Sequence, residues 1–278
     1  MARRSRVSRV WGRCAVFLAV ALTGVGVAPT SGAAVPNRDV TVLTFNIHHG
    51  ADPDDNLGLA RTADVIRDSG AEVIGLQEVD RHWSSRSDFV DQAQWLADRL
   101  DLHVAYAANL DEDPLKPGDP RRQYGTAILS RYPILETHNT LLPRSATGEQ
   151  RGLLEADVMV RGTELRFLNT HLEHTSQAER LSQVKEIDKI VASSTRPTVL
   201  VGDLNATPDT PEVGTLTSRL KDTWPAVGKG DGFTFDAVNP TERIDYVLTS
   251  PGIQARAAQV LNATASDHRP VRAELRLP

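Results

Sequence analysis

The chain contains many short stretches that predict β-strands. In some of them apolar residues alternate with other residues, and in others apolar residues follow one another without interruption. They lie at residues 39–47, 73–76, 103–107, 124–129, 134–141, 153–160, 165–168, 198–201, 244–248, 253–261 and 271–275. We expect the strand at 124–129 to pair with the strand at 134–141, and Arg161-Gly162 to join the next two strands as a hairpin. The chain is therefore expected to contain antiparallel hairpins as well as strands that alternate with helices.

Three stretches have helical periodicity. The first, at 57–68, is expected to be capped by Asn56 and to end at Gly70, and the second lies at roughly 89–100. Thr175 is expected to cap the third helix, which is long and amphipathic. The loop at 109–123 is rich in proline and charge, so we expect it to be exposed.

Residues 1–34 differ in composition from the rest of the chain. Five arginines precede an apolar run from Cys14 to Val27, and small residues follow up to Ala34. The run is about 14 residues long, whereas a spanning helix needs roughly 20. We therefore expect a secretory signal peptide cleaved after Ala33 or Ala34, a secreted protein without a transmembrane segment, and one domain at 35–278. The export route stays open, because the Arg3-Arg4 pair alone does not specify twin-arginine export.

The cysteine content and the net charge reduce the number of possible functions. Cys14, the only cysteine, lies in the predicted leader, so the mature protein has neither disulfides nor a cysteine nucleophile. Loss of the leader arginines would change the formal net charge from −5 to −10. An acidic surface does not attract a polyanion at long range, which argues mildly against tight non-specific nucleic-acid binding.

Polar side chains that can bind a metal or transfer a proton flank the predicted strands at six places. They are Asn46, Glu78, His171, Asp203 with Asn205, Asp245, and Asp267 with His268. Each one alone could be a turn or cap residue, but strand ends on one rim of a sheet converge in space. Carboxylate and amide oxygens bind a hard cation, and histidines move protons beside it. The pattern predicts hydrolysis of phosphate esters.

Six short motifs resemble those of the endonuclease/exonuclease/phosphatase superfamily, which has the deoxyribonuclease-I-like fold, and the resemblance spans nearly the whole mature chain. They are Thr44-Phe45-Asn46-Ile47, Leu76-Gln77-Glu78-Val79, Asn169-Thr170-His171-Leu172, Gly202-Asp203-Leu204-Asn205, Arg243-Ile244-Asp245-Tyr246 and Ser266-Asp267-His268-Arg269-Pro270. The resemblance implies an α/β fold, a four-layer α/β/β/α sandwich with two mixed β-sheets. It also implies a divalent cation, Mg²⁺ with Mn²⁺ or Ca²⁺ as alternatives.

The resemblance also implies a role for each residue. Glu78 is similar to the principal metal ligand, and Asn46 and Asp267 to residues that complete or orient the metal shell. His268 resembles the general base that activates water, and Asp245 the carboxylate that fixes its tautomer.

The remaining roles concern the phosphate. Asp203 and Asn205 resemble the pair that positions the nucleophile and steadies the transition-state phosphate. His171 is expected to act as a second, protonated imidazole on the phosphate oxygens.

Three further residues are expected to bind substrate. Tyr124 and Arg151 match family positions near the substrate phosphate, although each could be an ordinary strand residue. Arg86 could hold a second phosphate, with a solvated loop as the equal alternative. His48 and His49 lack the further nitrogen or sulfur ligands that a zinc site would need. His174 is expected to be a solvated loop residue.

The leading hypothesis is a secreted, Mg²⁺-dependent, monomeric hydrolase of phosphate esters that uses direct attack by water. Its substrate is a nucleic acid, a phospholipid headgroup or an inositol phosphate, so a nuclease, another phosphodiesterase, a sphingomyelinase-like enzyme and a phosphatase all stay open. A catalytically inactive member that binds a ligand in the same cleft is the alternative outside the enzymes. A serine hydrolase is disfavoured because the Gly-x-Ser-x-Gly motif is absent.

Overall fold

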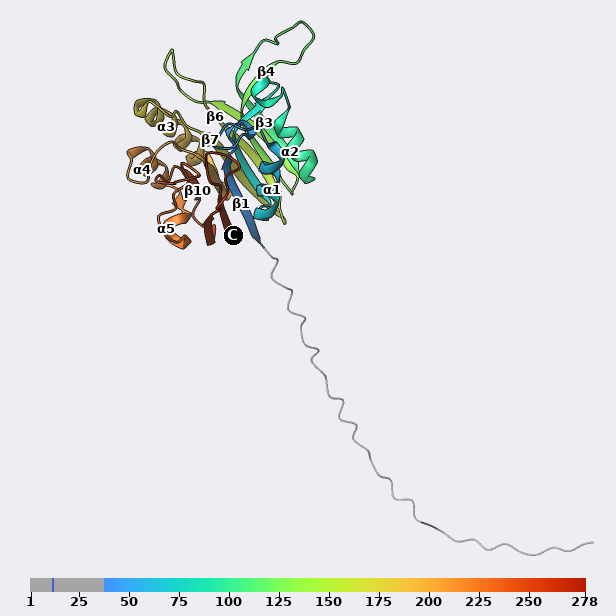
Figure 1. Ribbon diagram of the computed structural model, residues 1–278. Helices are drawn as coiled ribbons and strands as arrows, with labels where there is room; N and C mark the ends of the chain where they lie inside the picture. Colours follow the sequence, from blue (N-terminus) through green and yellow to red (C-terminus); the bar gives the residue numbers. More distant parts are fainter. Residues whose placement is uncertain (1–11, 13–37) are drawn as a thin grey trace, which may run out of the picture. The chain divides into compact units, whose positions relative to one another are not determined.

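The alternating segments of the sequence form two six-stranded β-sheets in the computed structural model, which describes residue 12 and residues 38–278. Apart from residue 12, the predicted leader lies outside the described residues. The first sheet has the order β11-β12-β1-β2-β4-β3, and the second has the order β5-β6-β7-β8-β10-β9 (Figure 1). Both sheets are mixed, because β1 pairs with β2 and β7 with β8 in parallel, whereas the other pairs are antiparallel.

The strands of the first sheet are β1 (Asp39–Asn46), β2 (Val73–Arg81), β3 (His103–Glu112), β4 (Arg122–Ser130), β11 (Gln254–Val260) and β12 (Val271–Arg276). Those of the second sheet are β5 (Ile134–Leu141), β6 (Gly152–Val160), β7 (Thr163–His171), β8 (Thr198–Asp203), β9 (Lys221–Asp222) and β10 (Asp245–Thr249). The helices are α1 (Leu59–Ser69), α2 (Gln92–Leu100), α3 (Gln177–Ser193), α4 (Pro211–Thr217) and α5 (Thr223–Val227), with short 3₁₀ helices at His48–Gly50 and Ser85–Ser87.

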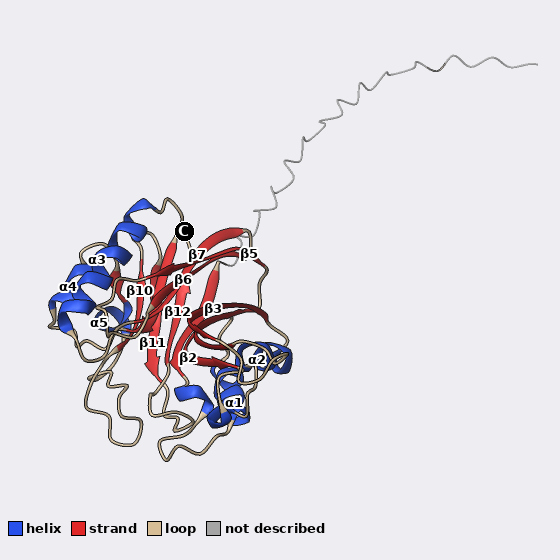
Figure 2. Ribbon diagram, turned by 90° about the horizontal axis from the view of Figure 1, so that it is seen from above, coloured by secondary structure: helices blue, strands red, loops and turns tan. Residues whose placement is uncertain are grey.

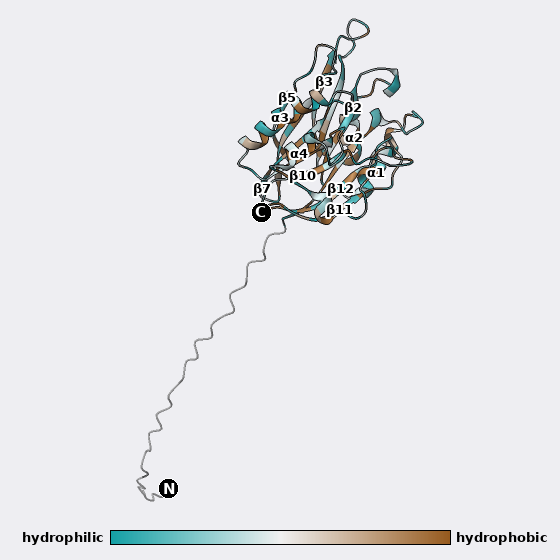
Figure 3. Ribbon diagram, turned by 90° about the vertical axis from the view of Figure 1, so that its left-hand side faces the viewer, coloured by the Kyte–Doolittle hydropathy of each residue, from teal (hydrophilic) through white to brown (hydrophobic). Residues whose placement is uncertain are grey.

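Three apolar layers hold these elements together, as expected of a four-layer sandwich. The middle layer lies between the two sheets, where Val42 and Val73 of the first sheet meet Phe167 and Val201 of the second. A second layer joins the first sheet to α1 and α2, and a third joins the second sheet to α3 and α4. Figure 2 shows the helices in two groups on opposite sides of the strands. Figure 3 shows brown, hydrophobic segments mainly on strands and teal ones mainly on peripheral loops. The predicted fold class is confirmed.

Two predicted helix caps are wrong. Gly58, not Asn56, precedes α1, because the Asn56 amide donates to Asp52. Ser176, not Thr175, caps α3, since the Thr175 hydroxyl donates to Glu173 while the Ser176 hydroxyl accepts from the third residue of the helix. The predicted end of α1 is confirmed, because Gly70 takes a left-handed conformation with φ of 65°.

The predicted pairing of 124–129 with 134–141 is also wrong. These segments are β4 and β5, which lie in different sheets: β4 pairs with β2 and β3, and β5 pairs with β6. The expected long loop is shorter, since β3 continues to Glu112 and β4 begins at Arg122. The hairpin across Arg161-Gly162 is present as β6 and β7. No helix of the described residues is both long and apolar enough to cross a bilayer.

Candidate active site

The polar residues at the strand ends are brought together by the strand register. In the second sheet, His171 of β7 pairs with Asp203 of β8, and Asp203 pairs with Asp245 of β10. In the first sheet, Asn46 of β1 pairs with the residue before Glu78. The two rims face each other, so residues far apart in sequence line one cavity of about 290 Å³.

Asp203 is the point at which the two sheets meet. Its Oδ2 accepts a hydrogen bond from Asn46 Nδ2 at 3.1 Å and lies 3.5 Å from His171 Nε2 and 3.6 Å from His268 Nε2. Its Oδ1 accepts from the backbone N–H of Asn205 at 2.9 Å. Four groups therefore fix a carboxylate that is almost completely buried.

His268 lies between two carboxylates. Its Nδ1 is 2.9 Å from Asp245 Oδ2, which leaves Nε2 directed toward Asp203. Burial favours the neutral ring, but the charges of Asp245 and Asp203 outweigh it and raise the pKa of His268 to about 10. Burial also raises the pKa of Asp203 to about 7, against the opposing effect of the His268 charge. Because these groups interact strongly, Asp203 and His268 titrate as a coupled pair, and the raised pKa of His268 does not fit the prediction of a histidine tuned toward neutrality on its own.

His171 differs from the prediction in its charge. Burial, and then the positive charge of Arg151, lower the pKa of His171 well below its ordinary value. Arg151 donates from Nη1 to His171 Nδ1 at 2.9 Å, so a neutral His171 carries its proton on Nε2. The predicted protonated imidazole is therefore wrong, because the arginine supplies the positive charge and the neutral ring supplies a hydrogen-bond donor.

Glu78 is aimed into the cavity by an irregularity of β2. The strand register shifts between Leu76 and Val79, and Glu78 takes a left-handed φ of 58°. Such bulges reorient a side chain and are common beside active sites. Asn46 donates from Nδ2 to Glu78 Oε1 at 3.0 Å and accepts from the backbone N–H of His48 through Oδ1. Asn46 therefore orients the Glu78 carboxylate.

These residues fit a hard divalent cation. Glu78 and Asp267 line the same cavity, and both offer carboxylate oxygens of the kind that Mg²⁺ prefers. Asp267 also accepts a hydrogen bond from the Ser266 hydroxyl at 3.1 Å. Ligand atoms of Asp203, Asp245 and His268 lie within 4.8 Å of one another, a spacing that could also hold a cation. The metal-binding role of each residue stays a prediction.

The three predicted substrate-binding residues lie in different places. Tyr124 and Arg151 both line the cavity. Arg86 is not among the residues that line the cavity; its guanidinium lies over the Tyr124 ring, 5.5 Å from the centroid, and forms two hydrogen bonds of 2.9 and 2.7 Å with the buried carboxylate of Asp80. Its predicted contact with a second phosphate stays a prediction.

Three residues that were not predicted from the sequence also line the cavity. Glu149 pairs with Arg151 at 3.0 Å, and the His174 ring lies 3.4 Å from the same guanidinium. The Phe235 ring packs against His268 in a tilted arrangement, with ring centroids 4.9 Å apart and an interplanar angle of 44°. Glu149 and His174 lie two and three residues from Arg151 and His171, and this proximity in sequence could have indicated that they belong to the site. No local sequence pattern indicates Phe235.

Comparisons with known proteins agree with this fold. The model of the Endonuclease/Exonuclease/phosphatase family matches residues 43–268. The structure of an endonuclease/exonuclease/phosphatase from Beutenbergia cavernae DSM 12333 is 27% identical and covers 86% of this chain and 72% of that chain, with a TM-score of 0.72. A mannosyl-6-phosphatase from Bacteroides thetaiotaomicron VPI-5482 is 19% identical and covers 85% of this chain and 99% of that chain, with a TM-score of 0.68.

A curated relative is more similar in sequence but much longer. Protein cwh43 of Schizosaccharomyces pombe is 31% identical over 169 residues, which are 60% of this chain and 16% of that protein. The activity of that whole protein is therefore not carried over to this chain. The matched family model covers five of the six motifs completely and the sixth as far as His268, and members of this family are metal-dependent phosphoesterases. This chain belongs to the endonuclease/exonuclease/phosphatase family.

Proposed function

We propose that this chain is an exported, Mg²⁺-dependent hydrolase of small, water-soluble phosphate esters that uses direct attack by water. The observation that carries the proposal is the position of Asp203, whose Oδ2 lies 3.1 to 3.6 Å from side chains of both sheets. Within one cavity, these residues provide a proton-accepting pair, donors for a phosphate and carboxylates for a cation.

The phosphate would be bound on the side of Arg151 and His171. The guanidinium of Arg151 is buried and held by Glu149 and His171, so little reorganisation is needed when negative charge develops. His171 would donate a hydrogen bond from Nε2. Asn205 lines the same cavity in a left-handed conformation, with its amide anchored on the backbone oxygen of Leu172.

The attacking water would lose its proton to the Asp203–His268 pair. Asp245 holds Nδ1 of His268, so Nε2 is the nitrogen that faces the cavity side of the pair. Glu78 and Asp267 would hold the cation, with Asn46 orienting Glu78. When bound, Mg²⁺ supplies positive charge for the non-bridging oxygens of the phosphate.

The charge around the cavity favours a small substrate over a nucleic acid. Among the described residues that line it, Arg151 is the single arginine or lysine. Four carboxylates line it as well, from Glu78, Glu149, Asp203 and Asp267. A nuclease site is expected to present several cations to the phosphate backbone. The fold similarity to a mannosyl-6-phosphatase also supports a small phosphate ester.

A substrate panel tests this function. The mature protein with Mg²⁺ would be assayed on mannose 6-phosphate, inositol phosphates, p-nitrophenyl phosphate, bis-p-nitrophenyl phosphate, sphingomyelin, DNA and RNA. We expect turnover of one soluble class, and a His268→Gln preparation purified in parallel controls for contaminating phosphatases. Turnover of DNA, RNA or sphingomyelin alone would overturn the small-substrate proposal. Failure on every substrate would favour the inactive, cleft-binding alternative.

Export is part of the proposal and rests on the sequence of residues 1–34. Five arginines, an apolar run and small residues in this order are typical of a cleaved leader. Expression of the full chain, fractionation of the culture and sequencing of the mature N-terminus would test it. A cell-retained protein with an intact N-terminus would contradict export.

A further inference from the structure

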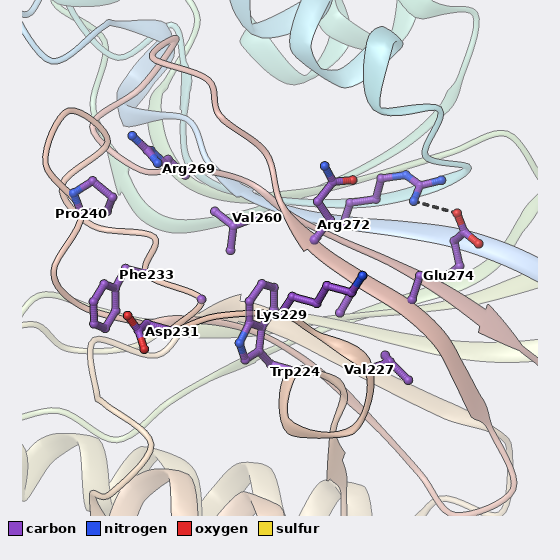
Figure 4. Close-up of a pocket in the computed structure, with 14 residues that line it drawn as sticks. Trp224, Val227, Lys229, Asp231, Phe233, Pro240, Val260, Arg269, Arg272 and Glu274 are labelled. Atoms are coloured by element: carbon purple, nitrogen blue, oxygen red, sulfur yellow. Dashed lines mark ion pairs between the residues drawn. The ribbon is translucent and has the colours of Figure 1, made fainter.

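A second cavity, of about 600 Å³, lies beside the strands β11 and β12 and shares no lining residue with the catalytic cavity. The loop that follows α5 forms one wall, and the two strands form another (Figure 4). Phe235 of this loop faces the catalytic cavity, whereas Phe233 lines the second cavity. The volume falls within the range of small-molecule binding sites.

Two aromatic rings line this cavity. Trp224 is held in place by the loop around it, because its Nε1 donates to the backbone oxygen of Gly230 at 3.1 Å. A β-carbon at Gly228 or Gly232 would come within 2.5 or 2.4 Å of the Trp224 ring, so the backbone lies directly against it. Phe233 is 37% exposed and lines the same cavity. A flat apolar group could contact these rings.

Three cations line the same cavity. Arg272 is already paired, since Nη1 lies 2.9 Å from Glu274 Oε1 and Nε donates to the backbone of Ser69. Arg269 donates from Nε to the backbone oxygen of Ala237 at 2.7 Å. Within residues 38–278, no carboxylate forms an ion pair with either Arg269 or Lys229. In Figure 4, Lys229 extends along Trp224 toward Arg272, while Asp231 lies near Phe233 at the other end.

We propose that this second cavity binds an organic anion that carries a flat ring. The ring would contact Trp224 and Phe233, where aromatic contacts and burial are favourable. The negative group would be bound by Lys229, whose charge has no carboxylate partner among the described residues and whose side chain lies along Trp224 (Figure 4). None of these residues takes part in the proposed hydrolysis, so the second site does not depend on that function.

A fluorescence titration of the full chain tests the second site. The probe is 8-anilinonaphthalene-1-sulfonate, which combines flat rings with one negative group. We expect saturable binding with one site per chain, and roughly tenfold weaker binding of N-phenyl-1-naphthylamine, which lacks the sulfonate. Equal affinity for both probes would overturn the anion site, because only an apolar surface would then be recognised.

Three variants test where the probe binds. Lys229→Glu and Phe233→Ala change exposed side chains outside the catalytic cavity, and each should weaken binding of the sulfonate about fivefold. Lys185→Glu makes the same charge change on an exposed position of α3 and should leave binding unchanged. Thermal unfolding would check that all three variants are folded. If both cavity variants bind the probe like the parent protein, the proposal is wrong.

Discussion

The inward faces of the central strands are apolar at one end of the sandwich and polar at the other. On β1 this face runs Val40, Val42, Thr44 and Asn46, all buried. The other central strands change in the same way: Leu165, Phe167, Asn169 and His171 on β7; Val199, Val201 and Asp203 on β8; and Val247 and Asp245 on β10. A period of two places each series on one side of its strand.

Between the two ends lies a completely buried set of hydrogen bonds. Gln77 Nε2 donates to Asn169 Oδ1 at 2.6 Å and to Thr44 Oγ1 at 3.1 Å. Asn169 Nδ2 donates at 2.8 Å to the backbone oxygens of Leu76 and Ala127 in the facing sheet. Apolar contact is non-directional, whereas hydrogen bonds require defined angles. The apolar end therefore supplies stability, and the polar end supplies position.

Removal of the metal should have the largest effect, and this effect on hydrolysis should arise only at the polar end of the sandwich. EDTA is expected to reduce hydrolysis by roughly four orders of magnitude, because the cation would stabilise the phosphate charge, and Mg²⁺ should restore it. Activity with and without chelator would be measured on the best substrate of the panel. Full activity in EDTA would contradict the metal role.

Replacing the predicted base should come next. His268→Gln keeps an amide donor for Asp245 but removes one member of the proton-accepting pair, so turnover should fall about 10³-fold. Turnover numbers would be compared at saturating substrate, with circular dichroism as the check on folding. A variant with near-normal turnover would exclude His268 from the proton-accepting pair.

A substitution at the apolar end should change stability and leave turnover nearly unaltered. Phe167→Ala removes a completely buried ring between the sheets, so the free energy of unfolding should fall by about 3–5 kcal/mol. Turnover per folded molecule should change little. Urea unfolding and active-site titration would separate the two quantities. A loss of turnover larger than the loss of folded protein would break the proposed division between the two ends.

Substitution of the buried arginine should give an intermediate effect on activity. Arg151→Lys keeps the charge but cannot bind Glu149, His171 and phosphate in the same planar arrangement. We expect kcat/KM to fall roughly 50-fold, or about 2 kcal/mol. Arg144→Lys, an exposed arginine of the same loop, is the matched control. Similar kinetics in both variants would argue against phosphate binding by Arg151.

The smallest effect is expected for a substitution in the buried set of hydrogen bonds between the two ends. Asn169→Ala removes one of the two acceptors of Gln77 Nε2 and the amide that donates to two backbone oxygens, so the free energy of unfolding should fall by about 2 kcal/mol. Turnover should also fall, by about tenfold, because His171 lies two residues further along the same face. A change in stability with unaltered turnover would show that these hydrogen bonds do not position the site.

The local pattern predicted most strands, because a period of two is set by the backbone of each strand alone. It also predicted that Glu78, Asp203 and His268 would share a rim, and the structure places them in one cavity. It did not predict which strands are neighbours. β4 and β5 are consecutive in sequence, yet they pair in different sheets, since pairing depends on long-range packing that the local pattern does not contain.

The sequence by itself therefore determined the family, the strand pattern and the chemical groups available to the site. Only the tertiary structure decided their protonation and surroundings: the neutral His171, the Asp203–His268 pair, and Phe235 against His268. The reason is physical. Residue identity fixes which groups can bind or transfer a proton, but burial and charges brought from distant parts of the chain set their pKa values and their partners.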